Sequence, residues 1–399
     1  MSVTIEVFPA SEGDSILVSS NSSNVLIDAG LYETYHTSIR PRLLKLARES
    51  KKIDLFVVTH IDKDHIEGAI ELLIENGNSS DPRLIDILEV WHNSYRHLQF
   101  EKEARIGEHE KEILRNIISS GRNYVGRTNK ESKEISSKHG SSLASLLLTG
   151  KYSWNEAFQG KAVQSANSEQ VEFNDIVLTL LSPDSKKLKR LENKWKNDLR
   201  RMKLNFVFSE EKIFDDAFEF ALLNSSSSTE EDVQKPISST QPKFENLIIN
   251  EKTSDKSITN GSSIAFIMEI CGVKILFLGD AHPDIITEQL EVMSKNESDR
   301  VYFDLVKISH HGSAKNTSLK LLRLIDCSKY IISTDGNKHG HPDIGTLAKI
   351  IHETRDKAIE IYCNYRTLNS QIIEDLIKSR NYRCTFIYPE DDKSLTIKL

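Results

Sequence analysis

Four ionisable side chains crowd one short loop of this 399-residue chain. Directly after the apolar run Ile53–Val58, six positions of the segment THIDKDHIEG hold His60, Asp62, Asp64 and His65. Carboxylates and imidazoles packed this closely repel or desolvate one another unless a cation binds them. Divalent metal ions accept both oxygen and imidazole nitrogen donors. The loop therefore predicts a metal site at the end of a buried strand, with spacing that allows two adjacent ions. A helix-capping role for Asp64 is the alternative, but capping explains one acid and neither histidine.

Composition excludes several other classes of protein. With 38% hydrophobic and 28% charged residues, the chain is expected to be soluble and globular. Its longest apolar runs, Ile264–Ile270 and Val273–Leu278, are far shorter than the roughly 20 residues of a membrane-spanning helix, and no basic segment precedes an apolar stretch at the start. The four cysteines lack CxxC spacing, so we expect buried thiols and a cytoplasmic location. A net charge of −7 argues against binding nucleic acid by bulk charge, which leaves a local basic patch open.

Periodicity predicts an alternation of strands and helices. Short alternating runs before Asp28-Ala29-Gly30 indicate a β-meander, and the spacing of apolar residues predicts a helix over Ile39–Ser50. Further strands are expected at Ile85–Trp91, Val171–Leu181, Leu305–Ile308 and Tyr330–Ser333, a hairpin turning at Cys271-Gly272, and helices at Glu101–Ser119 and Ile344–Glu353.

Two long segments interrupt this alternation. Lys186–Lys203 carries nine basic residues against two acids, with Leu188, Leu191 and Trp195 on one face, and predicts a basic amphipathic helix. Asn224–Lys243 is Ser-rich and poor in apolar residues, so we expect a disordered or mobile surface loop. The predicted organisation is a first half of the core at 1–82, a helical insertion or flank at 83–170, a core strand at 171–185, the basic helix and Ser-rich insertion at 186–256, and the second half of the core at 257–399.

Three further motifs carry the same kinds of side chain. They are Leu278-Gly279-Asp280 after a predicted strand, Ser309-His310-His311-Gly312-Ser313, and Gly340-His341-Pro342. With Asp28 in LIDAG, their order resembles the signature of the metallo-β-lactamase superfamily in its HxDxDH variant, and the HHGS and GHP elements are similar to those of the ComEC-like DNA-uptake branch. The resemblance covers roughly residues 1–75 and 260–345. It implies an α/β fold, an αββα sandwich of two mixed sheets with helices outside and metals at one edge.

The resemblance also implies a site and its chemistry. Two divalent ions, zinc or manganese, would lower the pKa of a shared water from 15.7 toward about 7 and direct the hydroxide at a phosphoryl or carbonyl centre. Asp62 in place of a second histidine moves the preference toward manganese. Asp280 is expected to bridge the ions, Asp64 to orient the water, and Asp28 to support the ligands. The implied metal ligands are His60, Asp62, Asp64, His65, Asp280, His310 and His341, and the implied catalytic residues are Asp64, His311 and Asp28.

Two points about the histidines stay open in the sequence. Neighbouring residues at a strand end point in opposite directions, so we expect only one of His310 and His311 to face the metals. Many superfamily members supply a further histidine between the second and fourth motifs, and no residue here stands in a recognisable motif for it. The candidates are His92, His97, His109 and His139.

These features predict a cytoplasmic metallohydrolase, a phosphodiesterase or nuclease whose substrate is a nucleic acid or another phosphodiester. The basic helix would guide a polyanion, or its apolar stripe would simply pack down and leave the charges solvated. Similar stand-alone hydrolases occur in anti-phage defence systems, which predicts a protein partner and no membrane. The alternatives are a hydrolase of a lactone, thioester or cyclic nucleotide, and a partner-regulated binding module without catalysis. A closed pocket roofed by residues 83–165 favours a small molecule, and an open groove continued by Lys186–Lys203 favours a polymer.

Overall fold

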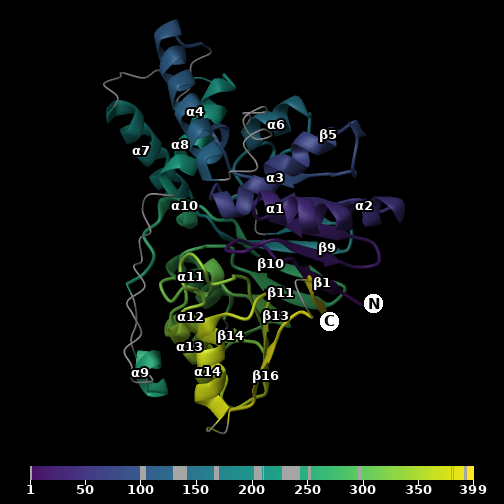
Figure 1. Cartoon of the computed structure of the whole chain (residues 1–399), viewed down its shortest axis with the longest axis vertical. Coiled ribbons are helices and arrows are strands. Elements are labelled where there is room, and N and C mark those ends of the chain that lie inside the picture. The colour runs from purple at the N-terminus through teal and green to yellow at the C-terminus, as the bar shows by residue number, and fades with distance from the viewer. Residues whose placement is uncertain are drawn as a thin grey trace.

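Two β-sheets lie face to face in the middle of the molecule, and helices cover both outer faces (Figure 1). The structure, a computed structural model, describes residues 2–98, 105–128, 142–165, 170–201, 209, 211–226, 243–249, 253–294, 299–378, 380, 382–390 and 393–399. The four layers confirm the predicted fold class, an αββα sandwich. No helix within these ranges is both long and apolar enough to cross a membrane.

The first sheet has six strands in the order β18-β1-β2-β3-β4-β7. Their bounds are β1 Thr4–Val7, β2 Ile16–Ser19, β3 Asn24–Ile27, β4 Leu55–Val57, β7 Val90–Trp91 and β18 Leu395–Lys398. β1, β2 and β3 form the expected meander, and β4 then adds parallel to β3. The last strand of the chain, β18, pairs antiparallel with the first. The predicted strand Ile85–Trp91 is shorter than expected because only its end, β7, joins the sheet.

The second sheet has eight strands in the order β17-β16-β15-β13-β11-β10-β9-β8. Their bounds are β8 Val171–Phe173, β9 Ile176–Ser182, β10 Ala265–Ile270, β11 Val273–Phe277, β13 Leu305–Lys307, β15 Lys329–Ile332, β16 Ile359–Cys363 and β17 Cys384–Ile387. β10 and β11 form the predicted hairpin at Cys271-Gly272, and from β11 to β17 all neighbours are parallel. The single strand predicted at Val171–Leu181 is instead a second hairpin, because Asn174 adopts a positive φ of 51° and reverses the chain.

Alternation along the strands assigns each side chain to a layer. In β2, Ile16 and Val18 belong to the apolar cluster between the sheets, whereas Leu17 belongs to the cluster under the outer helices. Side chains in a strand point to opposite faces with a period of two, so both faces of this sheet must be covered. The second sheet contributes Phe266 and Phe277 to the layer between the sheets. The inner core is therefore formed by both halves of the chain.

Two sets of helices cover the outer faces. On the first sheet lie α1 (Tyr32–Thr34), a π-helical turn (Tyr35–Ile39), α2 (Arg40–Arg48) and α3 (Lys63–Asn76). On the second sheet lie α9 (Phe244–Ile249), α11 (Pro283–Met293), α12 (Leu319–Arg323), α13 (Ile344–Glu353) and α14 (Leu368–Lys378). Small elements complete the described chain: the pairs β5 (Gly77–Asn78) with β6 (Asp81–Pro82) and β12 (Val301–Tyr302) with β14 (Ile325–Asp326), and 3-10 turns at Tyr95–His97, Glu156–Phe158 and His310–Gly312.

The helices of the predicted insertions at 83–170 and 186–256, with a short helix that follows them, pack together beyond α3 (Figure 1). They are α4 (Glu108–Thr128), α6 (Leu143–Thr149), α7 (Ser185–Arg201), α8 (Ile213–Ser226) and the short α10 (Ile258–Gly261). Trp195 of α7 is buried against Phe218 of α8, with ring centroids 5.5 Å apart, in the same cluster as Leu72 of α3. The apolar stripe of the predicted basic helix therefore packs down. Of the Ser-rich segment, residues 227–242 lie outside the described ranges.

A glycine in α3 allows this helix to approach the loop that follows β3. A Cβ at Gly68 would lie 2.0 Å from the carbonyl oxygen of Ala29, whereas a Cβ at Gly345 of α13 would meet the carbonyl oxygen of Leu247 at 3.3 Å. We expect Gly68→Ala to lower the free energy of unfolding by about 1–3 kcal/mol, because the backbones must separate. Gly345→Ala is the matched control and should cost little, since alanine has the higher helix propensity. Urea denaturation measures both, and equal losses would contradict the argument.

Glu71 of α3 predicts a pH dependence of stability. Burial, followed by the nearby carboxylates of Glu67 and Glu75, raises the pKa of Glu71 from 4.5 to about 7. The folded state therefore favours the neutral acid, and this stabilisation is complete below pH 4.5 and lost as the pH rises through 7. We expect Glu71→Gln to be on the order of 1 kcal/mol more stable than wild type at pH 8, and nearly equal to it at pH 4.5. Exposed Glu288→Gln, measured by the same denaturation series, should show no such pH-dependent difference.

Candidate metal centre

Parallel strand ends bring the predicted ligands to one edge of the sandwich. Asp28 directly follows β3, and His60 lies three residues after β4, which runs parallel to β3. Asp280 and His310 lie three residues after β11 and β13, which are also parallel. Two backbone hydrogen bonds hold these ends together: Ile264 N donates to Thr59 O at 2.9 Å, and His310 N donates to Gly279 O at 2.9 Å. The carboxyl ends of parallel strands are where α/β folds form their sites.

One carboxylate oxygen lies among four imidazole nitrogens. Asp280 Oδ2 is 3.6–3.8 Å from the Nε2 atoms of His60, His65, His310 and His311. These distances are too long for hydrogen bonds. They are close to the roughly 3.4 Å that separates two ligand atoms held about 2.1 Å from a shared tetrahedral ion. Asp280 and these imidazoles would therefore be able to hold divalent ions together.

The remaining acids divide the donors into two groups. Asp62 Oδ2 lies 3.5 Å from His60 Nε2. Asp64 Oδ2 lies 3.7 Å from His65 Nε2 and 3.4 Å from His311 Nε2. The sets His60–His65–Asp280 and Asp64–His65–His311 each offer donor atoms within 4.8 Å of one another. The alternative that Asp64 caps the helix is wrong, because the N-cap of α3 is Asp62, whose side chain makes no capping hydrogen bond, and Asp64 lies in the first turn.

Donor atoms in the cluster have no hydrogen-bond partner among the described residues. They are His60 Nε2, Asp62 Oδ1, His65 Nε2, Asp280 Oδ1 and His311 Nε2, and all are buried. Buried polar atoms in proteins nearly always have a partner. Divalent cations would provide one for this mixed set of oxygen and nitrogen donors, so the residues present fit such ions.

Hydrogen bonds at Nδ1 hold three of these rings in place. His65 Nδ1 donates to Asp28 Oδ2 at 2.8 Å, and Asp28 also accepts from Thr59 N at 2.7 Å and Thr59 Oγ1 at 2.8 Å. His310 Nδ1 donates to Asn316 Oδ1 and His311 Nδ1 donates to Ser333 O, both at 2.9 Å. Hydrogen bonds of this kind fix the ring orientation and leave Nε2 for the metal. Asp28 therefore supports His65 from behind, on the side away from Asp280.

Both histidines of the HHGS segment face Asp280, so the expectation that only one does so is wrong. That expectation assumed the alternation of an extended strand. His310 and His311 instead lie in a 3-10 turn in which both have a positive φ, 47° and 55°. The turn carries the two rings to the same side, with centroids 5.7 Å apart.

His341 lies beside the cluster. Its ring centroid is 5.5 Å from that of His310, and its Nδ1 is 3.7 Å from Asp343 Oδ2. It belongs to none of the donor groups found among the described residues, whereas His311 does. The role of His341 as a ligand stays a prediction.

The described candidates for the further histidine belong to none of the donor groups around Asp280. His92 Nε2 is 3.1 Å from Glu219, His97 contacts Ser94 and Asn155, and His109 lies on α4. His139 lies outside the described residues. His310 brings its nitrogen to the Asp280 side of the cluster in their place.

The sequence reasoning missed Asp14 and Lys307. Asp14 Oδ1 lies 3.5 Å from His311 Nδ1, and its carboxylate forms a buried ion pair with Lys307. The neighbouring Gly13 approaches α3 so closely that a Cβ there would lie 1.9 Å from Asp64 O. An acid and a glycine between two predicted strands, together with a lysine in the apolar run LVKIS, were the available signals.

Electrostatic coupling in the cluster is strong. Burial alone would raise the pKa of Asp280, but His310, His311 and His65 hold it well below its usual range. Burial alone would lower the pKa of His311, yet the carboxylates of Asp280 and Asp14 raise it to about 10. The charged forms of Asp280 and His311 thus stabilise each other. Metal ions would take the place of the imidazole protons, as metal binding generally does.

Comparison with known families supports this interpretation for part of the chain. Residues 9–119, which include Asp28 and the loop from His60 to His65, match the sequence model of the metallo-beta-lactamase superfamily. The match supports the superfamily, while the ComEC-like branch stays a prediction. No curated protein sequence matches the chain.

Solved structures with a similar arrangement are distant. They include the metallo-beta-lactamase fold protein YhfI from Bacillus subtilis (10% identity, 99% of each chain covered, TM-score 0.39) and a diphosphatase from the PhnP family (10% identity, 100% of this chain and 98% of that chain, TM-score 0.37). A CmlA beta-hydroxylase mutant is similar at 10% identity, over 100% of this chain and 54% of that chain, with a TM-score of 0.37. Similarities this distant carry no argument about function.

Metal binding should stabilise the fold through Asp280. At a free metal concentration of 100 times Kd, one bound ion adds about 2.7 kcal/mol to the free energy of unfolding. We expect Mn²⁺ or Zn²⁺ to raise the melting temperature of the chelator-treated protein, and Asp280→Asn to lose most of that rise. Exposed Asp86→Asn is the control and should keep it. If neither the metals nor the chelator changes the melting temperature of the wild type, the metal centre is contradicted.

Proposed function

We propose that this protein is a metal-dependent phosphodiesterase that hydrolyses its substrate with a water activated between two divalent ions, zinc or manganese. The observation that carries the proposal is the convergence of four imidazole Nε2 atoms on Asp280 Oδ2. Ions bound there would supply a hydroxide at neutral pH and neutralise charge on a phosphoryl group.

Each side chain has a role that follows from its position. Asp280 belongs to the group with His60 and His65 and also lies 3.7 Å from His311 of the other group, so it would contact ions held by either. Asp64 faces His65 and His311 and is only partly buried, so it can accept a proton from, and orient, the attacking water. Asp28 and Asp14 act indirectly, because each contacts the Nδ1 side of a ligand ring.

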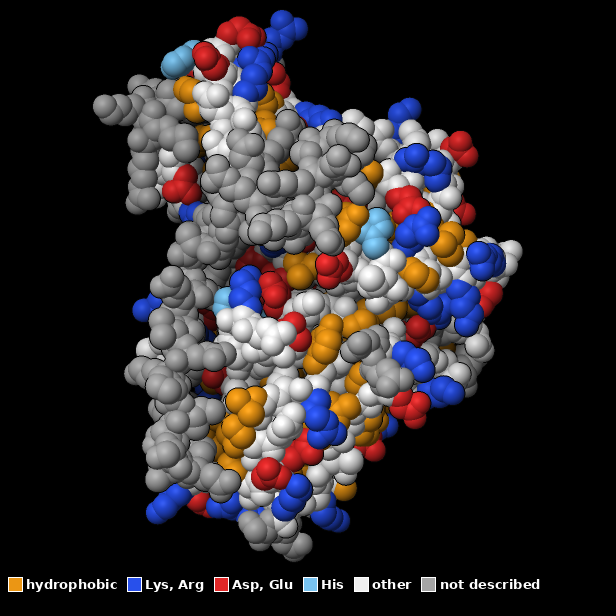
Figure 2. Space-filling view, in the orientation of Figure 1, with side chains coloured by type: hydrophobic (Ala, Val, Ile, Leu, Met, Phe, Trp, Pro, Cys, Tyr) orange, Lys and Arg blue, Asp and Glu red, His pale blue; other side chains and the backbone are white. Residues whose placement is uncertain are grey.

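A phosphoryl substrate is favoured over a carbonyl substrate by cations near the site. Lys187 and Arg190 of α7, together with Lys256, line a pocket that shares its wall with the metal centre. Figure 2 shows basic and acidic side chains interspersed over the described surface of one face. An anion would therefore be attracted by the few cations at the pocket and not by a broad basic surface. This agrees with the net charge of −7.

Finer assignments belong to the same proposal. The pocket beside α7 supports a nuclease or another nucleotide phosphodiesterase more than a lactone or thioester hydrolase, whose substrates lack the phosphate that these cations would bind. A ComEC-like origin, a role in anti-phage defence with a protein partner and a cytoplasmic location remain proposals that rest on the sequence resemblance and composition.

Hydrolysis of bis-p-nitrophenyl phosphate and of DNA and RNA oligonucleotides tests the proposal directly. We expect activity with Mn²⁺ or Zn²⁺ that a chelator abolishes, and a fall in kcat/KM of about 10²-fold or more in Asp64→Ala, because general-base catalysis contributes about that much. Asp86→Ala is the control and should behave as wild type. If all these substrates stay intact with either metal, or if Asp64→Ala cleaves them as fast as wild type, the protein is not a phosphodiesterase of this kind.

Metal analysis by mass spectrometry decides which late histidine ligates. We expect His311→Ala to contain less metal per chain than wild type, because its Nε2 faces both Asp64 and Asp280. His341→Ala is the comparison, since its ring neighbours that of His310 but joins none of the donor groups found among the described residues. Equal metal content in wild type and His311→Ala would contradict the assignment.

A further inference from the structure

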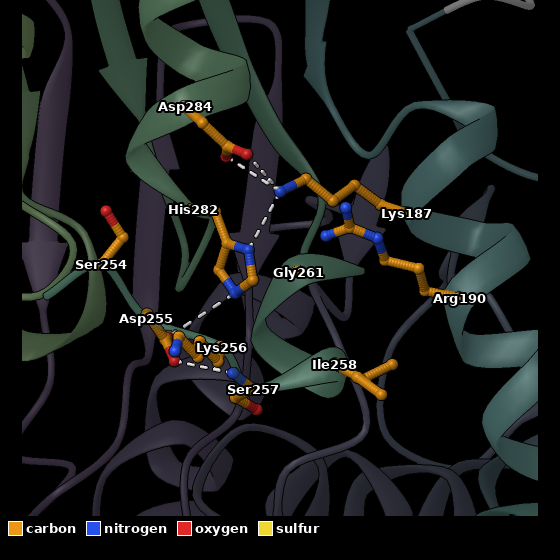
Figure 3. Close-up of a pocket in the computed structure, with 10 residues that line it drawn as sticks. All are labelled: Lys187, Arg190, Ser254, Asp255, Lys256, Ser257, Ile258, Gly261, His282 and Asp284. Atoms are coloured by element: carbon orange, nitrogen blue, oxygen red, sulfur yellow. Dashed lines mark hydrogen bonds and ion pairs between the residues drawn. The ribbon is translucent and has the colours of Figure 1, made fainter.

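A cavity of about 210 Å³ lies between α7 and the segment that precedes β10. In Figure 3, Lys187 and Arg190 extend from α7 on one side, residues 254–257 lie on the other, and His282 stands between them. A water molecule takes up roughly 30 Å³ in the liquid, and whole small-molecule ligands occupy pockets of about 300 Å³ or more. The cavity therefore suits one compact polar group.

The two acids in this pocket are already engaged by the protein. Asp284 accepts two hydrogen bonds from Lys187 Nζ, at 2.8 and 2.9 Å, and one from Ile285 N at 2.8 Å. Asp255 accepts from Ser257 N at 2.8 Å, Asn260 Nδ2 at 2.8 Å and Asn316 Nδ2 at 3.1 Å. Asp284 is therefore paired with a cation, Lys187, whereas the groups that donate to Asp255 are uncharged and hold this carboxylate in place.

Two cations of the pocket remain without such a partner. Among the described residues, no carboxylate lies within ion-pair distance of Arg190 or Lys256, and both side chains are exposed. Arg190 extends from α7 toward the same space as the ammonium group of Lys187 (Figure 3). Like charges that share a cavity repel one another unless an anion lies between them.

His282 adds a buried donor that is weakly satisfied, since the backbone of Ser257 is near the ring but forms no well-placed hydrogen bond with Nε2. The side chain is 6% exposed, and its Nδ1 accepts a hydrogen bond from Lys187 Nζ at 3.0 Å, so the ring hydrogen is on Nε2. That Nε2 has no hydrogen-bond partner among the described residues, and the nearest carboxylate oxygen, Asp255 Oδ2, is 3.8 Å away. An unpaired buried donor is costly and suggests a ligand that accepts hydrogen bonds.

The pocket and the metal centre lie on opposite sides of one short segment, residues 257–259. Ser257 and Ile258 line the pocket, while Thr259 Oγ1 donates to the predicted ligand Asp62 at 3.3 Å. Ser257 and Thr259 are two residues apart, so their Cα atoms lie within about 7 Å of each other. Asp255 joins the two sides directly, with Oδ2 3.6 Å from His310 Nδ1 and 3.8 Å from His282 Nε2.

We propose that this α7–α10 pocket binds a phosphate group of the substrate that neighbours the phosphodiester cleaved at the metal centre. Arg190 would bind two phosphate oxygens in a fork, Lys256 would approach from the opposite wall, and His282 Nε2 would donate a further hydrogen bond. The proposal rests on the proposed function and deepens it: the substrate carries at least two phosphate groups, as in an oligonucleotide or a 5′-phosphorylated dinucleotide.

The first test measures binding without catalysis. Inorganic phosphate is titrated into chelator-treated protein and followed by calorimetry, so that metal ions cannot bind it. We expect the wild type to bind phosphate, and the double variant Arg190→Ala/Lys256→Ala to bind it at least tenfold more weakly. The control Lys161→Ala/Lys186→Ala also removes two exposed cations, one of them on α7, and should change Kd less than twofold. Thermal denaturation confirms that each variant is folded.

The second test measures substrate choice. The ratio of kcat/KM for a 5′-phosphorylated dinucleotide to that for bis-p-nitrophenyl phosphate, which has a single phosphate group, should fall about tenfold in Arg190→Ala/Lys256→Ala. The ratio should stay at the wild-type value in the control. A fall in this ratio together with weakened phosphate binding supports a substrate pocket.

The outcomes separate the pocket from the proposed function. In one outcome, the wild type binds phosphate, the double variant does not, and no diester is hydrolysed. This result would support an anion site and reject the phosphodiesterase. Hydrolysis that depends on Asp64, with an unchanged ratio in the double variant, would support the enzyme and overturn the pocket. Chelator-treated wild type that binds no phosphate, or a double variant that binds it as wild type does, would also overturn the pocket.

Discussion

The concentration of charge around Asp280 is the constraint on which the rest of the site depends. Imidazoles from both halves of the chain, His60 and His65 from one and His310 and His311 from the other, approach a single carboxylate oxygen within 3.6–3.8 Å. Burying an ion costs several kcal/mol unless opposite charges and hydrogen bonds compensate. The hydrogen bonds behind the rings, to Asp28, Asn316 and Ser333, allow such a cluster to persist inside a folded protein.

The sandwich provides the geometry for this cluster. Parallel strands in each sheet end at the same edge, and the apolar layer that contains Phe266 and Phe277 fixes the separation of the two sheets. Close backbone contacts then set the loops: Gly13 lies against Asp64, and Gly68 against Ala29. The site is therefore rigid because its ligands follow packed strands, which suits chemistry that depends on fixed donor positions.

The two insertions add what the core alone lacks. Their helices share one apolar cluster with α3, and α7 presents Lys187 and Arg190 to the segment that also contacts Asp62. The packing stripe and the basic face of α7 are compatible, because Trp195 and Leu191 point into the cluster while Lys186, Lys189 and Arg190 are exposed.

Local sequence determined much of this protein. The apolar alternation of the first strands predicted the β-meander, and the crowding of two acids and two histidines between His60 and His65 predicted where the donors begin, because both signals depend on neighbours in the chain. Only the tertiary structure decided that His310 and His311 face the same way, that Asp14 pairs with Lys307, and that Asp255 links His310 to His282. The first depends on an unusual backbone turn. The others join residues far apart in sequence, whose contacts exist only once the two sheets have packed.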